Sequence, residues 1–191
     1  MRIRYLKQAW LVLVLAILFA AALGGVQIML GAKISENQRN ETYDQIPLLV
    51  PGARKDKTTE QTVDRMQGYS AFDSAGEQIG WVVRAGGQGY ADRIELLIGL
   101  DAACEKITGL YVLEQKETPG LGNHITDADW REQFTSKPAT RALGITRETP
   151  VGDGEILAIT GATISSQSVC EIVNETVRRF RRAIAETASE D

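Results

Sequence analysis

Histidine and cysteine are scarce in this chain of 191 residues, which contains one histidine, His124, and two cysteines, Cys104 and Cys170. The cysteines lie far apart and form no CxxC pair, so the sequence shows neither a zinc-ligand pattern nor a dithiol motif. No Ser-His-Asp, HExxH or paired-carboxylate arrangement is visible. The run Gly86-Gly87-Gln88-Gly89 lacks the GxGxxG spacing and the βαβ setting of a dinucleotide-binding fold. The motifs of hydrolases, metalloenzymes and Rossmann dehydrogenases are therefore missing.

A surplus of basic residues is also missing. Lysine and arginine number 21 against 25 aspartates and glutamates, which gives a net charge of −4. Proteins that bind nucleic acid usually carry a basic face, so we expect no nucleic-acid partner. The basic run Arg178, Arg179, Arg181 and Arg182 is interpreted as the solvated end of a helix, where cations suit the negative end of the dipole.

Charge is absent from a long stretch near the N-terminus. No charged residue occurs from Gln8 to Ala32, and spanning a bilayer as a helix takes roughly 20 apolar residues. Arg2, Arg4 and Lys7 precede this stretch, so the positive-inside rule predicts a cytoplasmic N-terminus and an extracytoplasmic, periplasmic remainder. The expected location is the inner (cytoplasmic) membrane, crossed once.

A cleaved signal peptide is the alternative, because the small residues Ala20-Ala21-Ala22 follow the apolar run. Apolar residues resume at Val26 and continue to Leu30, which favours a retained anchor. Both interpretations export the domain. In an exported protein Cys104 and Cys170 can pair, although two free thiols are the default expectation.

Composition divides the chain into three parts. We expect a cytoplasmic tip and transmembrane anchor at 1–32, a polar tether with some local helix at 33–65, and a folded domain at 66–191. The length leaves room for one such domain beside a membrane segment.

The domain has the patterns of an α+β fold, in which a small antiparallel sheet is combined with a long C-terminal helix. Residues 69–72 and 79–84 flank a glycine-containing turn and predict a hairpin. The other expected strands are 94–100, 107–114 and 156–160, and the expected helices are 127–134 and 165–186.

The segment Thr160-Gly161-Ala162-Thr163-Ile164-Ser165-Ser166 carries the most informative local chemistry. It combines a sharp turn of small residues with a helix start rich in hydroxyls. Free N–H groups and the dipole at a helix N-terminus attract anions, so the segment is a plausible phosphate site. An ordinary Ser/Thr helix cap explains the same residues equally well.

The same segment closely resembles the signature of the FMN-binding domain found in the G subunits of Rnf electron-transport complexes, and the C subunit of the sodium-translocating NADH:quinone reductase carries a similar motif. In that family the second threonine, here Thr163, is esterified to the FMN phosphate by a flavin transferase that uses FAD as donor. The resemblance thus implies covalent FMN on Thr163. It also implies cofactor contacts from Thr160, which replaces the commoner serine, and from Gly161, Ala162, Ser165 and Ser166.

A second match is the loop Glu117-Thr118-Pro119-Gly120-Leu121-Gly122, which the family carries in the same form. Resemblance implies that this loop packs against the flavin ring through Thr118, Gly120, Leu121 and Gly122. Leu121 has the character needed to cover an apolar ring face. Glu117 either meets the flavin or fixes the loop, and the two roles stay open.

A third and weaker match is Gly89-Tyr90, where Ala91 departs from the family's Gly-Tyr-Gly piece. His124 follows the second loop and is a candidate proton donor to reduced flavin. The family does not require histidine there, so an incidental loop residue is the simpler interpretation.

The resemblance implies an electron carrier within a membrane complex that couples ferredoxin and NAD redox chemistry to sodium or proton movement. Other subunits of that complex and a flavin transferase are the implied partners. One alternative is the C-type subunit of a sodium-translocating NADH:quinone reductase. Others are a standalone membrane-tethered flavin domain, regulatory or reductase in role, and a domain without redox function in which Thr163 only caps a helix.

Overall fold

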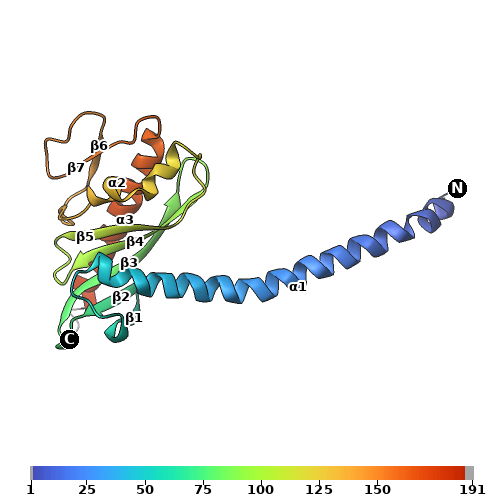
Figure 1. Cartoon of the computed structure of the whole chain (residues 1–191), viewed down its shortest axis with the longest axis horizontal. Coiled ribbons are helices and arrows are strands. Elements are labelled where there is room, and N and C mark those ends of the chain that lie inside the picture. Colours follow the sequence, from blue (N-terminus) through green and yellow to red (C-terminus); the bar gives the residue numbers. More distant parts are fainter. Residues whose placement is uncertain (1, 188–191) are drawn as a thin grey trace. The chain divides into compact units, whose positions relative to one another are not determined.

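The computed structural model describes residues 2–187, with the side chains of 2–8 and 32 left aside. It contains two compact units, Met1–Glu41 and Thr42–Asp191. The elements, labelled in Figure 1, are α1 (Arg2–Leu49), η1 (Lys55–Lys57), β1 (Thr59–Val63), β2 (Met66–Phe72), β3 (Gln78–Gln88), β4 (Arg93–Asp101), β5 (Ile107–Glu114), η2 (Gly122–Thr126), α2 (Ala128–Glu132), β6 (Gly144–Thr146), β7 (Glu155–Leu157) and α3 (Thr163–Thr187).

The first unit is helical throughout its described residues. Its apolar side chains are exposed: Trp10 is 59% accessible, and Ile28 and Met29 are each 79% accessible. The span Ala9–Leu49 contains an 18-residue window of mean hydropathy 2.6, and within the described residues it is the one helix long and apolar enough to cross a membrane. The predicted orientation depends on Arg2, Arg4 and Lys7, whose side chains lie outside the described set.

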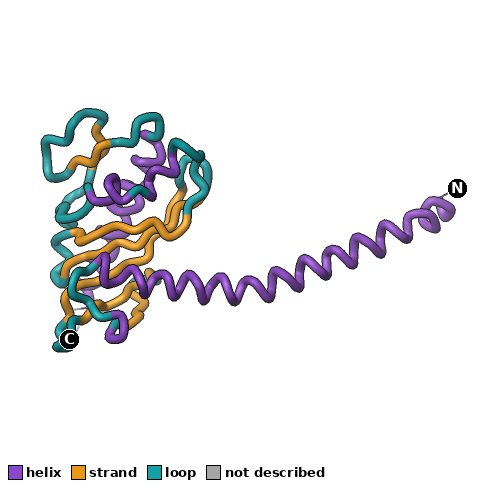
Figure 2. The backbone as a smooth tube through the Cα atoms, viewed as in Figure 1, coloured by secondary structure: helices purple, strands orange, loops and turns teal. Residues whose placement is uncertain are grey.

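The second unit is built on an antiparallel sheet in the order β1-β2-β3-β4-β5. The expected hairpin is confirmed as β2 and β3, which pair from Gly68 opposite Val83 to Phe72 opposite Gln78. Each later strand pairs with its sequence neighbour, so the sheet is a simple meander (Figures 1 and 2). The α+β class predicted from the sequence is therefore correct.

Side chains alternate between the two faces of this sheet, as the period of two in a β-strand requires. On β3, Trp81 and Val83 belong to the core that α3 covers, whereas Val82 belongs to a second core on the other face. The α3 core includes the contact of the Trp81 ring with Phe180 at a centroid distance of 5.3 Å. Helix α3 therefore lies against the sheet through its predicted apolar residues.

The second core shows why the compact unit begins earlier than the sequence suggested. Ile46, Leu49 and Val50 pack with Tyr69 and Leu97, and Ile46 is fully buried. Burying such a side chain contributes about 2 kcal/mol. The expected tether at 33–65 thus differs from the structure: residues 42–65 form part of the compact unit, and β1 pairs with β2.

Other boundaries differ by a few residues. Strand β7 ends at Leu157 rather than at residue 160, and α3 begins at Thr163 rather than at Ser165. Helix α2 covers Ala128–Glu132, within the predicted 127–134. The earlier start of α3 matters because it places Thr163 in the first turn of a 25-residue helix.

Candidate functional site: a cavity at the start of helix α3

The chain enters α3 through a tight turn. Gly161 has φ +80°, a conformation that side-chain-bearing residues rarely adopt, and the Ala162 N–H donates to the Ile159 carbonyl at 2.9 Å. A Cβ added at Gly161 would lie 3.0 Å from Cδ2 of Leu121. Glycine is needed here both for the turn and for the approach of the 117–122 loop.

Strand β7, which precedes the turn, is held in place by Trp130 of α2 and by Gln133, the residue directly after α2. The Trp130 Nε1–H donates to the Leu157 carbonyl at 2.9 Å, and the Leu157 N–H donates to Oε1 of Gln133 at 2.8 Å. Trp130 is buried beside Phe134, with ring centroids 5.3 Å apart. This packing fixes where the turn begins.

Two hydroxyls of the motif form hydrogen bonds with other residues of the protein. Ser166 is fully buried, and its Oγ accepts the Ile159 N–H at 3.0 Å and donates to the Ala162 carbonyl at 3.0 Å. Ser165 is 2% exposed and donates to Oε2 of Glu117 at 2.6 Å. Ser166 therefore closes the turn, and Ser165 ties the helix to the neighbouring loop.

Glu117 is a buried carboxylate at the centre of this connection, with 4% of its surface exposed. Its Oε2 accepts the Ser165 hydroxyl, and its Oε1 accepts the Ala91 N–H at 3.1 Å. A Cβ on Gly122 would lie 2.8 Å from Oε2 of Glu117, so glycine lets the loop close over the carboxylate. Glu117 thus joins three segments, which is the loop-fixing role that the sequence left open.

A cavity of about 500 Å³ opens where these segments meet. It is lined by Tyr90, Thr118, Leu121, Gly122, Arg147, Gly161, Ala162, Thr163, Ile164 and Ser165. Seven of the residues predicted from the sequence therefore line one cavity. Glu117, Gly120, Thr160 and Ser166 do not line it. Thr160 is exposed, and Gly120, with φ +76°, shapes the loop.

Arg147 is a lining residue that no sequence motif pointed to. It follows β6 and also lines a smaller neighbouring cavity of about 370 Å³, and Thr163 is common to both. In the part of the chain that the structure describes, Arg147 forms no hydrogen bond or ion pair. Tyr90, part of the weakest motif match, and Ile164, inside the motif, are exposed lining residues as well.

The remaining candidates lie away from the cavity. His124 Nδ1 contacts Oδ2 of Asp127 at 2.8 Å on the surface, and His124 does not line the cavity. Cys104 and Cys170 are buried free thiols. Burial raises the pKa of Cys104 to about 11, with Asp101 adding to the effect, and raises the pKa of Cys170 to about 12, with Glu171 adding to the effect. No group of three His, Cys, Asp or Glu residues suited to a metal occurs within 2–187.

Comparison with known proteins agrees with this geometry. Residues 89–178 match the FMN-binding domain family, and every residue that lines the 500 Å³ cavity falls inside that range. The G subunit of the Na(+)-translocating ferredoxin:NAD(+) oxidoreductase complex of Acetobacterium woodii is 38% identical over 110 residues, which cover 56% of this chain and 52% of that protein.

The G subunit of an ion-translocating oxidoreductase complex from Methanosarcina acetivorans is also 38% identical, over 57% of this chain and 55% of that protein. The chain thus spans about half the length of these curated relatives in the matched regions. The crystal structure of Shewanella oneidensis NqrC has the same fold, with a TM-score of 0.55, 21% identity, and coverage of 71% of this chain and 72% of that chain. Residues 89–178 therefore resemble the FMN-binding domain family, within a chain that is similar to the G subunits of ion-translocating oxidoreductase complexes.

Proposed function

We propose that this chain is an electron-transfer subunit of a membrane-bound, ion-translocating ferredoxin/NAD oxidoreductase complex, and that it carries FMN as a phosphoester on Thr163. The observation that carries the proposal is the single cavity that joins Thr163 to the 118–122 loop inside the matched FMN-binding domain.

The chemistry of the cavity suits FMN. Its volume of about 500 Å³ lies in the range of cofactor sites, roughly 300–1,000 Å³. Thr163 at the N-terminus of α3 and the cation Arg147 suit a phosphate, because the helix dipole and the guanidinium both favour negative charge. Tyr90, Leu121 and Ile164 expose apolar surface for a planar ring. Bound FMN would supply the redox chemistry, while the protein supplies position and electrostatics.

Thr163 is the hydroxyl best placed for esterification. Ser165 and Ser166 are buried and hydrogen-bonded, and Thr160 does not line the cavity. Thr163 lines the cavity, and its hydroxyl forms no hydrogen bond with any described residue. In the transfer, Thr163 Oγ1 bonds to the phosphorus of the FMN half of FAD, the pyrophosphate bond breaks, AMP leaves, and the hydroxyl proton is released. A flavin transferase is the partner required for this step.

The apolar helix supports membrane attachment. We propose that Ala9–Leu49 includes a single transmembrane span, with the N-terminus in the cytoplasm and the FMN-binding domain on the periplasmic side. Because no charged residue occurs from Gln8 to Ala32, this span offers no ion pathway of its own. Ion movement therefore belongs to other subunits. The C-type quinone-reductase subunit ranks second because NqrC shares the fold, whereas the relatives at 38% identity are G subunits.

The test is to express the full chain together with a flavin transferase and to look for covalent flavin. We expect flavin fluorescence on a denaturing gel and an intact mass increased by FMN minus water. Thr163→Ala abolishes both signals, whereas Thr163→Ser, which keeps a hydroxyl, retains them. A matched variant, Ser166→Ala, also retains them. A covalent flavin band that persists in Thr163→Ala contradicts the attachment site. Failure of the wild-type chain to co-purify with other subunits of the complex contradicts the proposed role.

A further inference from the structure

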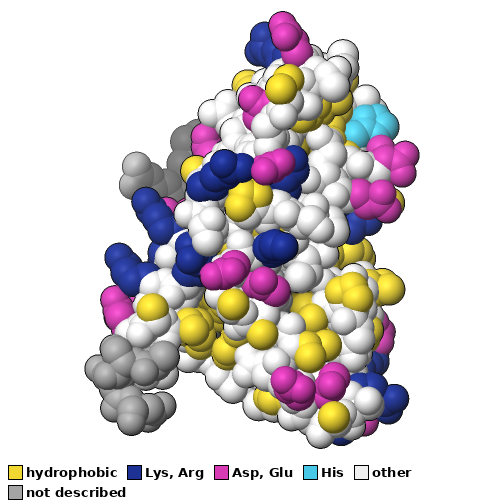
Figure 3. Space-filling view, turned by 90° about the vertical axis from the view of Figure 1, so that its left-hand side faces the viewer, with side chains coloured by type: hydrophobic (Ala, Val, Ile, Leu, Met, Phe, Trp, Pro, Cys, Tyr) yellow, Lys and Arg dark blue, Asp and Glu magenta, His cyan; other side chains and the backbone are white. Residues whose placement is uncertain are grey.

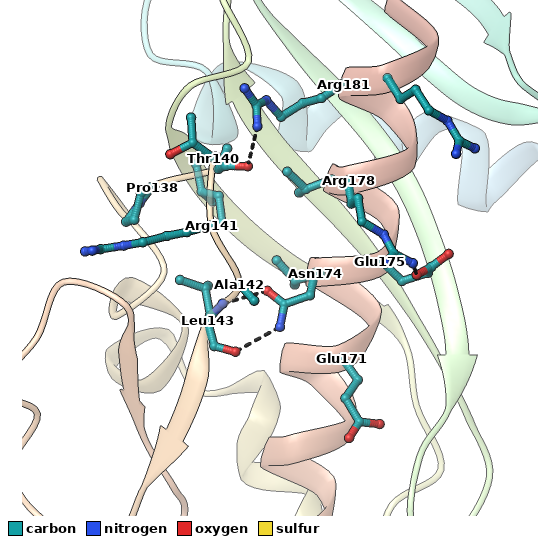
Figure 4. A pocket seen from close by; sticks show the side chains of 15 residues that line it. Pro138, Thr140, Arg141, Ala142, Leu143, Glu171, Asn174, Glu175, Arg178 and Arg181 are labelled. Atoms are coloured by element: carbon teal, nitrogen blue, oxygen red, sulfur yellow. Dashed lines mark hydrogen bonds and ion pairs between the residues drawn. The ribbon is translucent and has the colours of Figure 1, made fainter.

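A second and larger hollow lies along α3, apart from the flavin cavity. This groove has a volume of about 700 Å³ and runs between the segment Pro138–Leu143 and the helix (Figure 4). Its floor is apolar and includes Ile107, Val173 and Val177, which are all buried. None of the residues that line the flavin cavity lines this groove.

The wall opposite α3 is held in place from the helix. The Leu143 N–H donates to Oδ1 of Asn174 at 2.8 Å, and Nδ2 of Asn174 donates back to the Leu143 carbonyl at 2.8 Å. Nη1 of Arg181 donates to the Ala139 carbonyl at 3.3 Å. Figure 4 shows Asn174 and Arg181 reaching across the groove from α3. The groove is therefore already formed without an occupant, which lowers the entropic cost of binding.

Between these fixed points the backbone is unpaired. Thr140, Arg141 and Ala142 are exposed, and in the described part of the chain their N–H groups form no hydrogen bond. A short row of free backbone donors beside an apolar floor is the arrangement that an extended peptide uses for recognition, with main-chain hydrogen bonds and alternate side chains directed into the groove.

The excess of positive charge in the groove predicts an occupant with negative charge. Four arginines line it (Arg141, Arg178, Arg181 and Arg182) against two glutamates (Glu171 and Glu175), although the chain as a whole has a net charge of −4. The face shown in Figure 3 carries both basic and acidic side chains beside hydrophobic ones.

The existing ion pairs of these arginines can be exchanged. Arg141 contacts Asp153 at 3.6 Å, and Arg182 contacts Glu186 at 3.9 Å, with all four side chains exposed. Arg178 pairs with Glu175 one turn earlier on the helix. Such exposed pairs contribute little to stability, so carboxylates of a partner can replace them.

We propose that this groove binds an extended, acidic peptide segment with apolar side chains, supplied by a neighbouring subunit of the complex. The identity of the partner rests on the proposed function, whereas the groove itself does not depend on flavin. The docking site places the contact along α3, on residues other than those that line the flavin cavity.

The experiment uses the full chain within its complex, purified from membranes of its host. A photo-reactive amino acid replaces Ala142, and the crosslinked peptide is identified by mass spectrometry. In parallel, Arg178→Glu/Arg182→Glu is compared with Arg179→Glu, which changes charge on the same helix outside the groove. Covalent flavin content and thermal unfolding are measured for each variant.

We expect the crosslink to join residue 142 to a segment of another subunit that contains Asp or Glu. We also expect Arg178→Glu/Arg182→Glu to retain covalent flavin and to bind the other subunits on the order of tenfold more weakly, since repulsive charge at an interface weakens association. Arg179→Glu binds normally. A crosslink to lipid alone, a crosslink to a segment without acidic residues, or equal behaviour of the two variants overturns the proposal. Absence of covalent flavin from the wild-type complex, with the crosslink as expected, would instead count against the proposed attachment and leave the groove assignment standing.

Discussion

The cavity around Thr163 and the buried layer beneath it are made from the same stretch of sequence but have opposite properties. Thr163 lines the cavity, and its hydroxyl has no hydrogen-bond partner among the described residues, whereas the hydroxyls of Ser165 and Ser166 are buried and hydrogen-bonded. Of these three hydroxyls within four positions, one has no hydrogen-bond partner among the described residues and two are hydrogen-bonded in the buried layer. Helix geometry makes the division, because successive residues face directions about 100° apart.

We therefore expect substitutions in the buried layer to lower the free energy of unfolding, whereas substitution of Thr163 should remove only the covalent flavin. The largest effect is expected at Glu117. Glu117→Ala leaves the Ser165 hydroxyl and the Ala91 N–H without their acceptor, at a cost of about 3 kcal/mol in the free energy of unfolding. Urea unfolding of the flavin-free protein measures this. Thr163→Ala is the control and should change stability by less than about 0.5 kcal/mol.

Ser166→Ala is expected to have the next largest effect. It removes the fully buried acceptor of the part-buried Ile159 N–H and lowers the free energy of unfolding by about 2 kcal/mol. Covalent flavin content, measured below the unfolding transition, should stay near that of the wild type. Equal free energies of unfolding for Ser166→Ala and Thr163→Ala would contradict the contrast between the buried layer and the cavity.

Gly161→Ala tests the turn that connects the buried layer with the cavity, and we expect a smaller loss of stability than for Ser166→Ala. Alanine at φ +80° is strained by about 1 kcal/mol, and its Cβ would lie 3.0 Å from Leu121. Both stability and the extent of flavin attachment should fall, because the turn belongs to both regions. Gly144→Ala is a matched control, since a Cβ at Gly144 meets nothing within 4 Å and its φ is not positive. Similar behaviour of the two variants would argue against a special turn at Gly161.

The smallest effect on stability is expected from ionisation of the two cysteine thiols near neutral pH. Burial raises the thiol pKa from an ordinary 9.0 to about 11 for Cys104 and about 12 for Cys170. The native state therefore keeps its protons where the unfolded state loses them, and stability falls as the pH rises above 9. At pH 8 alkylation of both thiols should be slow in the native protein and fast in denaturant. Fast native labelling of Cys170 would contradict its burial in the core between α3 and the sheet.

Much of the fold follows from local patterns. Runs of β-prone residues on either side of turns predict the four strands β2 to β5, and the spacing of Val169, Ile172, Val173, Val177 and Phe180 predicts α3. The patch 46–50 reads locally as part of a tether, but in the structure it is buried against the second face of the sheet. Nothing local distinguishes a solvated apolar patch from one that meets a sheet formed later in the chain.

The candidate site divides in the same way. Residue order alone established the two motifs, Thr160–Ser166 and Glu117–Gly122, the uncharged N-terminal segment, and the lack of metal or nucleophile motifs. The folded chain was needed to see that Thr163 is the open hydroxyl, that Glu117 lies behind the cavity, and that Arg147 and Tyr90 line it. Residue type and spacing set what a segment can do. Which of its side chains are buried depends on segments that are distant in the sequence and meet only when the sheet, the loop and α3 pack together.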